Sequence, residues 1–313
     1  MGLGDFLHWT AIVRDLYNDI NTGEFIDRIN KIKRYIENYN NKKKVYGVYK
    51  YKHTNDIDNF KIVLVCSKFK STMYKLLFFN NPYIISCQIT ECKNIEYPNI
   101  IYLNIVSSHY YINKKFLDKK HVIATYSQTM GIPNYLIKPD IHFTEREIIK
   151  VKKFLPKDNF IYIEPTNHKP GRSYPFEKFQ SIVNKYKDVI EFVQISPSKF
   201  ADKASNVLDN VTSFIDKFTF RETLYYISFA KLVIVNHGGL SIGAAVTNTK
   251  TIAIYTAWFD PVMTKFKNEI SISIATTDHN RCNSFYNKPC KICLNLFLKH
   301  DVNIITKYID ELF

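Results

Sequence analysis

Apolar and mixed segments alternate along the chain, which predicts an α/β architecture with largely parallel sheets. Short runs that are apolar throughout are typical of buried strands, and apolar residues three or four positions apart are typical of helices. Strands are expected at residues 61–66, 100–106, 122–126, 160–163, 189–195, 232–235 and 251–255. Helices are expected at residues 6–17, 25–39, 74–79, 145–154, 176–186, 220–230, 240–246 and 302–313.

The series is interrupted once, at Pro156-Lys157-Asp158-Asn159. Proline and the polar residues after it are typical of a break between elements. A length of 313 residues suits two domains. We therefore expect one domain at residues 1–153 and a second at 154–313.

Composition excludes several classes of protein. Hydrophobic residues make up 46% of the chain, which is too many for a disordered protein. No apolar run approaches the ~18 residues of a membrane span, and no basic-then-apolar leader opens the sequence. The six cysteines are too sparse for a secreted disulfide framework, so we expect reduced thiols and a cytoplasmic protein.

Positive charge is concentrated in the first half of the chain. The net charge is +14, of which residues 1–155 carry +10 and residues 156–313 carry +4. A basic half is typical of proteins with an anionic partner, such as nucleic acid, a membrane surface or a phosphorylated substrate. Solvated surface lysines are an equally good interpretation.

The first candidate motif is Gly2-Leu3-Gly4-Asp5, which runs into a helix that carries His8. Its two glycines permit a tight turn and close approach of the backbone to a ligand. Asp5 is then either an N-cap that accepts hydrogen bonds from helix N–H groups or a carboxylate placed to accept a proton. A strand normally precedes such a turn in a doubly wound domain, so either the sheet lacks that strand or the natural start lies upstream.

Two further motifs each follow a predicted strand and precede a helix. The first is a polar loop whose candidate ligands are Thr166, Asn167, Lys169 and Arg172. The second is a glycine turn with candidate ligands Asn236, His237, Gly238, Gly239, Leu240 and Ser241. N–H groups at the start of a helix attract anions. Two such loops in one half of the chain fit a nucleoside diphosphate better than a single phosphate, although a long polar loop and a capping histidine remain open as structural alternatives.

A cysteine-rich segment lies near the end of the chain. Cys282, Cys290 and Cys293 could supply three thiolates to a metal, with His279 as a fourth ligand. Ordinary reduced or buried thiols are the favoured interpretation, so no metal and no cofactor are expected.

Taken in order, these segments resemble glycosyltransferase family 9, the heptosyltransferase family. The resemblance is carried by Gly2 to Asp5, by Asn80-Asn81-Pro82 after a short helix, by Arg172-Ser173-Tyr174-Pro175, by residues 230–239 and by the cysteines at 282–293. It extends over nearly the whole chain. The sequence departs from the family pattern at His237, where Asp is usual, and at Ile242, where His is frequent. Arg172 replaces a typical Lys, and no acidic residue follows Ser196-Pro197 to grip a donor ribose.

The resemblance implies a GT-B fold, in which two Rossmann-like domains face a cleft and the last helix, at residues 302–313, crosses back toward the junction. The first domain would bind the acceptor, with Gly4 and His8 on that side, and the second would bind a nucleotide-diphosphate sugar. It also implies an inverting, metal-independent transfer of a heptose or another hexose-like sugar, as in lipopolysaccharide or glycan biosynthesis. Asp5 would be the general base. Arg172 and the turn at Gly238 and Gly239 would hold the leaving diphosphate.

The implied acceptor is an anionic glycan or glycolipid, reached by peripheral contact with the inner face of a membrane. One alternative is a degenerate GT-B protein that binds nucleotide or glycan without turnover, which the changes at His237 and Ile242 motivate. Another is a nucleic-acid-binding protein, but the sequence lacks the signature of a known module, so nucleic acid is not the expected partner. The sugar, the nucleotide base, the acceptor and the oligomeric state are not specified by these patterns.

Overall fold

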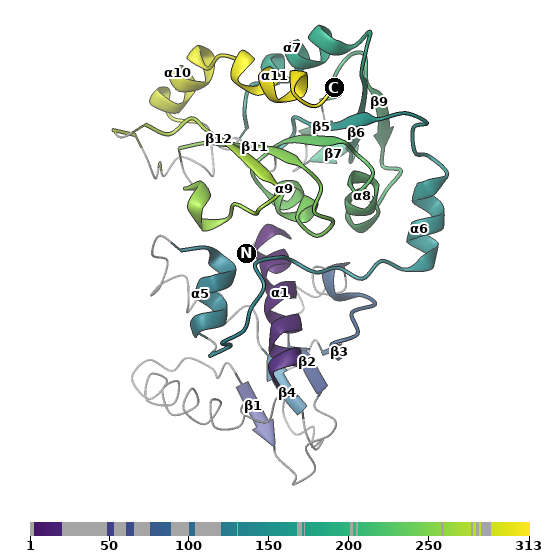
Figure 1. Ribbon diagram of the computed structural model, residues 1–313, viewed down its shortest axis with the longest axis vertical. Coiled ribbons are helices and arrows are strands. Elements are labelled where there is room, and N and C mark those ends of the chain that lie inside the picture. Colours follow the sequence, from purple (N-terminus) through teal and green to yellow (C-terminus); the bar gives the residue numbers. More distant parts are fainter. Residues whose placement is uncertain are drawn as a thin grey trace. The chain divides into compact units, whose positions relative to one another are not determined.

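The fold is described from a computed structural model of the chain (Figure 1). The described residues are 3–20, 49–52, 61–65, 76–88, 100–103, 120–129, 131–167, 171, 173–200, 203–204, 206–257, 260–276, 278–279, 282 and 289–313. They fall into two compact units, Met1–His142 and Phe143–Phe313. The helix expected at residues 25–39 lies outside the described residues. Across these residues, no helix combines the length and apolarity that a membrane crossing requires.

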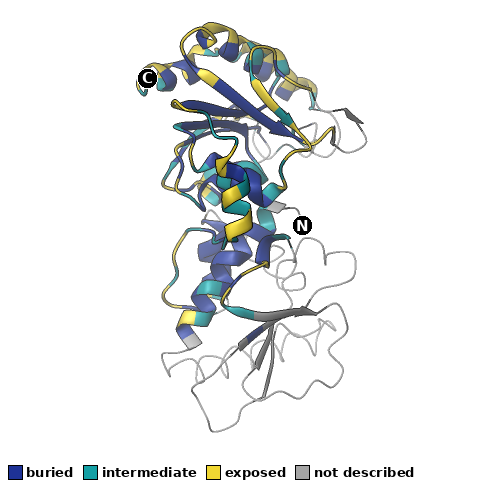
Figure 2. Ribbon diagram, turned by 90° about the vertical axis from the view of Figure 1, so that its right-hand side faces the viewer, coloured by how far each residue is buried: buried dark blue, intermediate teal, exposed yellow. Residues whose placement is uncertain are grey.

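Unit 2 is built on a six-stranded parallel sheet. Its strands lie in the order β12-β11-β10-β5-β6-β9. They are β5 (Phe160–Glu164), β6 (Glu191–Ser196), β9 (Thr212–Ile215), β10 (Leu232–Asn236), β11 (Thr251–Tyr255) and β12 (Glu269–Ser273). Every residue of β5, β10 and β11 is buried, as Figure 2 shows for the middle of the sheet. Strands covered on both faces are apolar throughout, which is why the sequence predicts these three so closely.

Helices cover both faces of this sheet. On one side lie α7 (Phe176–Tyr186), α10 (Lys291–Lys299) and α11 (Asn303–Asp310), and on the other lie α8 (Phe220–Ile227) and α9 (Gly239–Ala244) (Figure 1). Buried Phe179, Phe297 and Ile305 from the first group pack with the strands in one core. The short strands β7 (Lys199–Phe200) and β8 (Lys203–Ala204) form a separate antiparallel pair, and η3 (Pro261–Met263) is a single 3₁₀ turn.

Helix α6 (Glu145–Lys152) packs on α8 through a reciprocal arrangement of charges. Each helix begins with a capping box in which a threonine and the glutamate three residues later hydrogen-bond to each other's backbone N–H. Glu147 of α6 also accepts from Arg221 of α8 at 2.6 Å, and Glu222 of α8 accepts from Lys150 of α6 at 2.8 Å. These pairs join α6 to unit 2, while the domain boundary at 153/154 stays a prediction.

The C-terminal helix α11 packs on α7. The Tyr186 hydroxyl donates to Asp310 Oδ1 at 2.6 Å, and Lys185 Nζ donates to Thr306 Oγ1 at 3.0 Å. Ile309 in the same helix is fully buried. These contacts lie within unit 2, and the crossing back that the resemblance suggests stays a prediction.

Unit 1 has a four-stranded sheet in the order β1-β4-β2-β3. Its strands are β1 (Tyr49–Lys52), β2 (Lys61–Val65), β3 (Ile84–Gln88) and β4 (Ile100–Leu103), and only β1 runs antiparallel to its neighbour. Helix α1 (Leu3–Ile20) contacts β2 and α5 (Val122–Thr129). The rings of Trp9 and Tyr126 stack at 4.9 Å between α1 and α5.

One predicted element of unit 1 is wrong. Residues 122–126 were expected to form a strand, but they lie in helix α5. The run Val-Ile-Ala is too short for its periodicity to separate a buried strand from a buried helix. His121 stabilises the start of the helix, because its Nδ1 accepts a hydrogen bond from the Ile123 N–H at 3.2 Å and its carbonyl accepts one from the Thr125 N–H at 2.9 Å.

Candidate functional site

The candidate site lies at the carboxyl ends of the strands in unit 2. From β5 the chain proceeds outward through β6 to β9, then returns to place β10 on the other side of β5. The strand order therefore reverses between β5 and β10, where Val235 lies opposite Glu164. Loops that leave two such neighbouring strands diverge, and the crevice between them is the usual ligand site of open α/β sheets. Both unit 2 motifs from the sequence begin at this point.

Asn236 joins the two loops. Its amide Nδ2 donates to the Pro165 carbonyl at 2.7 Å, and its Oδ1 accepts from the Tyr174 N–H at 2.8 Å. Only 4% of Asn236 is exposed. The side chain predicted to contact a donor thus bonds at both ends within the protein, which makes Asn236 a positioning residue for the loops.

Asn167 and Thr166 lie on the loop after β5 and are half-buried. Asn167 Nδ2 donates to the His237 carbonyl at 3.3 Å, a second bond between the two loops. Lys169 and Arg172, predicted on the same loop, lie outside the described residues. The structure thus brings Thr166 and Asn167 beside the glycine turn.

The glycine turn is held by its own polar groups and by an aromatic ring. The His237 ring stacks on Tyr255 of β11, with centroids 4.2 Å apart and planes 14° from parallel. Ser241 Oγ lies 3.4 Å from His237 Nδ1 and accepts from the Gly238 N–H at 3.0 Å. From the sequence, His237 could be a ligand or a structural histidine. In the structure it is 6% exposed, and its ring packs against its neighbours.

The backbone N–H groups of the turn are the groups best placed to meet an anion. Gly239 and Leu240 open α9, and the first amides of a helix have no carbonyl one turn earlier to bond. Gly238, Gly239 and Leu240 are partly exposed. Gly238 has φ 166° and ψ −153°, an extended conformation open to any residue, and an added Cβ would come no closer than 3.7 Å to Asn167 Nδ2. The fold does not require glycine here, so a role in ligand approach is one remaining reason for it.

Glu164 is a buried acid beneath the site that sequence reasoning did not single out. It ends β5 and accepts hydrogen bonds from the Ser196 hydroxyl and from the Thr166 N–H, the latter at 2.8 Å. Burial raises the pKa of Glu164 to about 7, against the lowering effect of these hydrogen bonds. The feature of the sequence that could have identified Glu164 is a glutamate at the end of an otherwise apolar strand. Through Thr166, Glu164 fixes the start of the loop.

The predicted site residues of unit 1 lie on helix α1. Gly4 and Asp5 are in its first turn, and Asp5 is half-buried. The helix already begins at Leu3, so Asp5 lies inside the first turn rather than at the N-cap. His8 is 2% exposed, with its ring edge-on to His121 at 6.0 Å. These assignments remain predictions.

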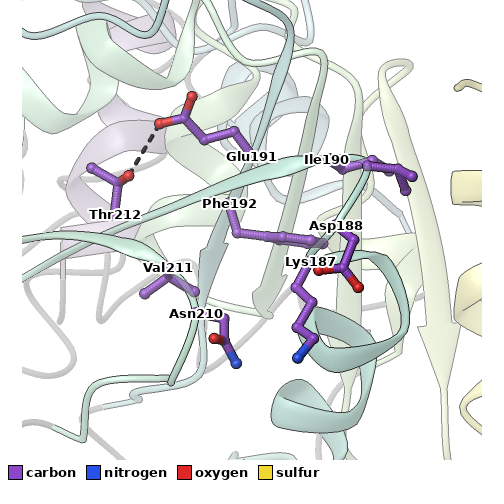
Figure 3. A pocket seen from close by; sticks show the side chains of 9 residues that line it. Lys187, Asp188, Ile190, Glu191, Phe192, Asn210, Val211 and Thr212 are labelled. Atoms are coloured by element: carbon purple, nitrogen blue, oxygen red, sulfur yellow. Dashed lines mark hydrogen bonds between the residues drawn. The ribbon is translucent and has the colours of Figure 1, made fainter.

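A surface hollow of about 420 Å³ lies away from this site (Figure 3). It is lined by Lys187 to Phe192 and by Asn210 to Thr212, and the Thr212 hydroxyl donates to Glu191 Oε1 at 3.1 Å. Glu191 and Thr212 begin β6 and β9. The hollow is therefore at the amino ends of the strands, the opposite edge of the sheet from the candidate site.

No protein-family model matches the sequence, and no curated protein matches it. Solved structures do match the fold. The structure of glycosyl transferase family 9 from Veillonella parvula aligns over 82% of this chain and 97% of its own, with a TM-score of 0.55 and 13% identity. The iron-containing dodecameric glycosyltransferase TibC from enterotoxigenic E. coli aligns over 84% of this chain and 77% of its own, with a TM-score of 0.53 and 10% identity.

The chain therefore has the GT-B fold, as the sequence predicts. The predicted resemblance to glycosyltransferase family 9 is confirmed at the level of fold, by likeness to solved structures of that family.

Proposed function

We propose that this protein transfers a heptose or another hexose-like sugar from a nucleotide-diphosphate sugar to a glycan or glycolipid acceptor. The observation that carries the proposal is the strand-order reversal between β5 and β10, with two hydrogen-bonded loops at the carboxyl ends of those strands. The shared fold adds support, because one structure that matches it is heptosyltransferase TibC in complex with ADP-D-β-D-heptose, with a TM-score of 0.53 and 9% identity.

The proposed reaction is an inverting displacement without a catalytic metal. The acceptor hydroxyl oxygen forms a bond to the anomeric carbon, and the bond from that carbon to the diphosphate oxygen breaks. The nucleoside diphosphate leaves with the bonding electron pair, and Asp5 takes the hydroxyl proton. Arg172 and the N–H groups of Gly239 and Leu240 stabilise the charge on the leaving diphosphate, a task that falls to hydrogen-bond donors when no metal is used.

The proposed acceptor is anionic. The first half of the chain carries +10, which favours a phosphorylated glycan or glycolipid at a membrane surface. Gly4 and His8 are proposed to contribute to the acceptor side, and lipopolysaccharide or other glycan biosynthesis in the cytoplasm is the proposed setting.

Donor binding is tested by thermal shift with ADP, UDP and GDP and with their sugar conjugates. A ligand that binds only the folded state raises the unfolding midpoint, by an amount that grows with its concentration relative to its dissociation constant. We expect at least one nucleoside diphosphate to raise it. Arg172→Ala should weaken that binding by ~1.5–3 kcal/mol, the contribution of a hydrogen bond to a charged group.

Lys187→Ala is the matched control. Lys187 is an exposed basic residue in the same unit that lines the hollow at the opposite edge of the sheet. This variant should bind nucleotide like the wild type. If Lys187→Ala weakens binding and Arg172→Ala does not, the nucleotide occupies the hollow and the assigned site is wrong. Binding without sugar transfer to any acceptor would favour the degenerate GT-B alternative.

A further inference from the structure

Four side chains with metal-binding atoms converge at the start of helix α10, in unit 2. They are His279, Cys282, Cys290 and Cys293, and their ligand atoms all lie within 4.8 Å of one another. Cys290 and Cys293 belong to the first turn of α10, where Cys290 is the N-cap residue. Cys282 and His279 come from the segment between β12 and α10.

The distances in this cluster suit ligands around a common ion. Cys282 Sγ and Cys290 Sγ are 3.6 Å apart, and His279 Nε2 lies 3.3 Å from Cys290 Sγ and 3.1 Å from Cys293 Sγ. Two sulfurs bound tetrahedrally at ~2.3 Å from a zinc ion lie about 3.8 Å apart. A disulfide would bring two sulfurs to about 2.05 Å. These three distances are thus close to the edges of a coordination tetrahedron, and all four atoms lie within 4.8 Å of one another.

The surroundings of the cluster also suit bound thiolates. Cys293 is 2% exposed, and Cys282 and Cys290 are partly buried against the core of unit 2, which includes Phe297. The Cys293 N–H donates to Cys290 Sγ at 3.3 Å. Backbone donors to a ligand atom are the usual outer shell of a metal site, since they orient the ligand and stabilise its negative charge.

We propose that His279, Cys282, Cys290 and Cys293 bind one tetrahedral metal ion, zinc or iron. Three thiolates and one imidazole are a donor set that both ions accept and that hard cations such as magnesium avoid. All four positions are filled by protein side chains, which is typical of a structural rather than a catalytic metal. The site therefore leaves the proposed transfer chemistry metal-independent, and it does not depend on that function.

The ion would fasten the segment after β12 to helix α10. The Cys282 N–H already donates to the Ala257 carbonyl, just beyond β11, at 3.0 Å. At the other end of α10, His300 Nδ1 lies 2.8 Å from the hydroxyl of Tyr174, and the Tyr174 N–H bonds to Asn236. Helix α10 thus links the cluster to the candidate donor loops, and loss of the ion should loosen this side of unit 2.

The test is the metal content of the full-length protein, purified under reducing conditions and measured by plasma mass spectrometry. We expect close to one equivalent of zinc or iron per chain. Iron would give thiolate-to-iron charge-transfer absorption, and zinc would be colourless and released by a thiol-reactive reagent. Cys290→Ser and His279→Ala should lose most of the metal. Cys92→Ser, which removes a cysteine distant in the sequence, should keep it.

Stability provides a readout that does not require the variants to fold. Removal of the ion from the wild-type chain with a chelator should lower its thermal midpoint, and zinc or iron(II) should restore it. Cobalt(II) added to the metal-free chain should show the intense visible absorption of a tetrahedral thiolate site. The proposal is overturned if the wild type holds no stoichiometric transition metal and none of these ions shifts its midpoint. A Cys282–Cys290 disulfide found by mass spectrometry in the wild-type protein as purified under reducing conditions would also overturn it.

Discussion

At the scale of single residues, Asp5 is the side chain on which the proposed chemistry depends most. It is half-buried in the first turn of α1, where a carboxylate also interacts favourably with the helix dipole. A hydroxyl is a weak nucleophile until a base takes its proton, so Asp5→Asn should lower turnover by ~10²–10⁴. Donor affinity and the unfolding midpoint should stay near wild type, because asparagine is close in size and shape. Steady-state transfer assays with thermal denaturation of the same preparations measure both effects.

Glu145→Gln serves as the control for Asp5→Asn. Glu145 is an exposed acid in the first turn of α6, so its substitution makes the same chemical change at another helix start. It should leave turnover unaltered. If Asp5→Asn keeps most of its activity, or if both variants lose activity equally, Asp5 only stabilises its helix.

Glu269 is a second residue with a measurable consequence. It is 5% exposed, and burial raises its pKa to about 7 although the Tyr255 hydroxyl donates to its Oε1 at 2.7 Å. A carboxyl whose folded pKa lies above its unfolded value binds more protons when folded. Folding stability should therefore fall as pH rises from about 4.5 to 7, by up to ~1.4 kcal/mol per pH unit for one such group.

Glu269→Gln should flatten that fall, because glutamine keeps the acceptor oxygen and has no charge to bury. Urea unfolding at pH 5, 6, 7 and 8 measures the free energy of unfolding of both proteins. The free energy of unfolding of the variant should increase relative to that of the wild type as pH rises. Glu164, whose pKa burial also raises to about 7, should leave part of the slope in place. Parallel curves for the two proteins would show that Glu269 ionises normally.

At the scale of elements, the close contact between α8 and α9 depends on one glycine. An added Cβ at Gly243 would overlap Leu224 Cδ2 and lie 3.0 Å from Cδ1. Leu224 is fully buried, so its side chain has little room to move away. Gly243→Ala should destabilise the protein by about 1–3 kcal/mol, the usual cost of overpacking. Denaturant unfolding with nucleotide binding on the same sample measures the loss of stability and its effect on the glycine turn.

The double variant Gly243→Ala/Leu224→Val separates overlap from helix propensity. A smaller residue at 224 makes room for the new methyl group. The double variant should therefore lose less unfolding free energy than the sum of the losses in the two single variants. Strict additivity would contradict the overlap. Alanine stabilises an isolated helix relative to glycine, so a stabilised single variant would also mean that α9 and α8 are less tightly packed than described.

Elements differed in how well local pattern predicted them, and burial explains the difference. The central strands β5, β10 and β11 are covered on both faces, so their unbroken apolar runs end within a residue of the predicted limits. Edge strand β9 has only one partly buried residue and carries no such run, and it was not predicted. Helix α10 was also missed, because its cysteines and apolar residues were interpreted as a motif rather than as a helix face.

At the scale of the whole molecule, unit 2 gathers its functional candidates through one sheet. The glycine turn follows β10, the polar loop follows β5, and the cysteine cluster bonds to the chain just beyond β11. Because the strands are parallel, everything that follows them along the chain meets at one edge. The residues proposed to bind a donor and those proposed to bind a metal therefore lie on one sheet, although 112 positions separate His279 from Asn167 in the polar loop.

The sequence alone determined the fold class, most buried strands of unit 2, helix α7 and the loops that carry the candidate ligands. These follow from local patterns, since periodicity records which side of an element faces the core. Only the tertiary structure decided which strands are neighbours. It also decided that the Asn236 side chain hydrogen-bonds to two loops and that the His237 ring stacks on Tyr255. Such juxtapositions depend on long-range packing between distant segments, and no local pattern encodes them.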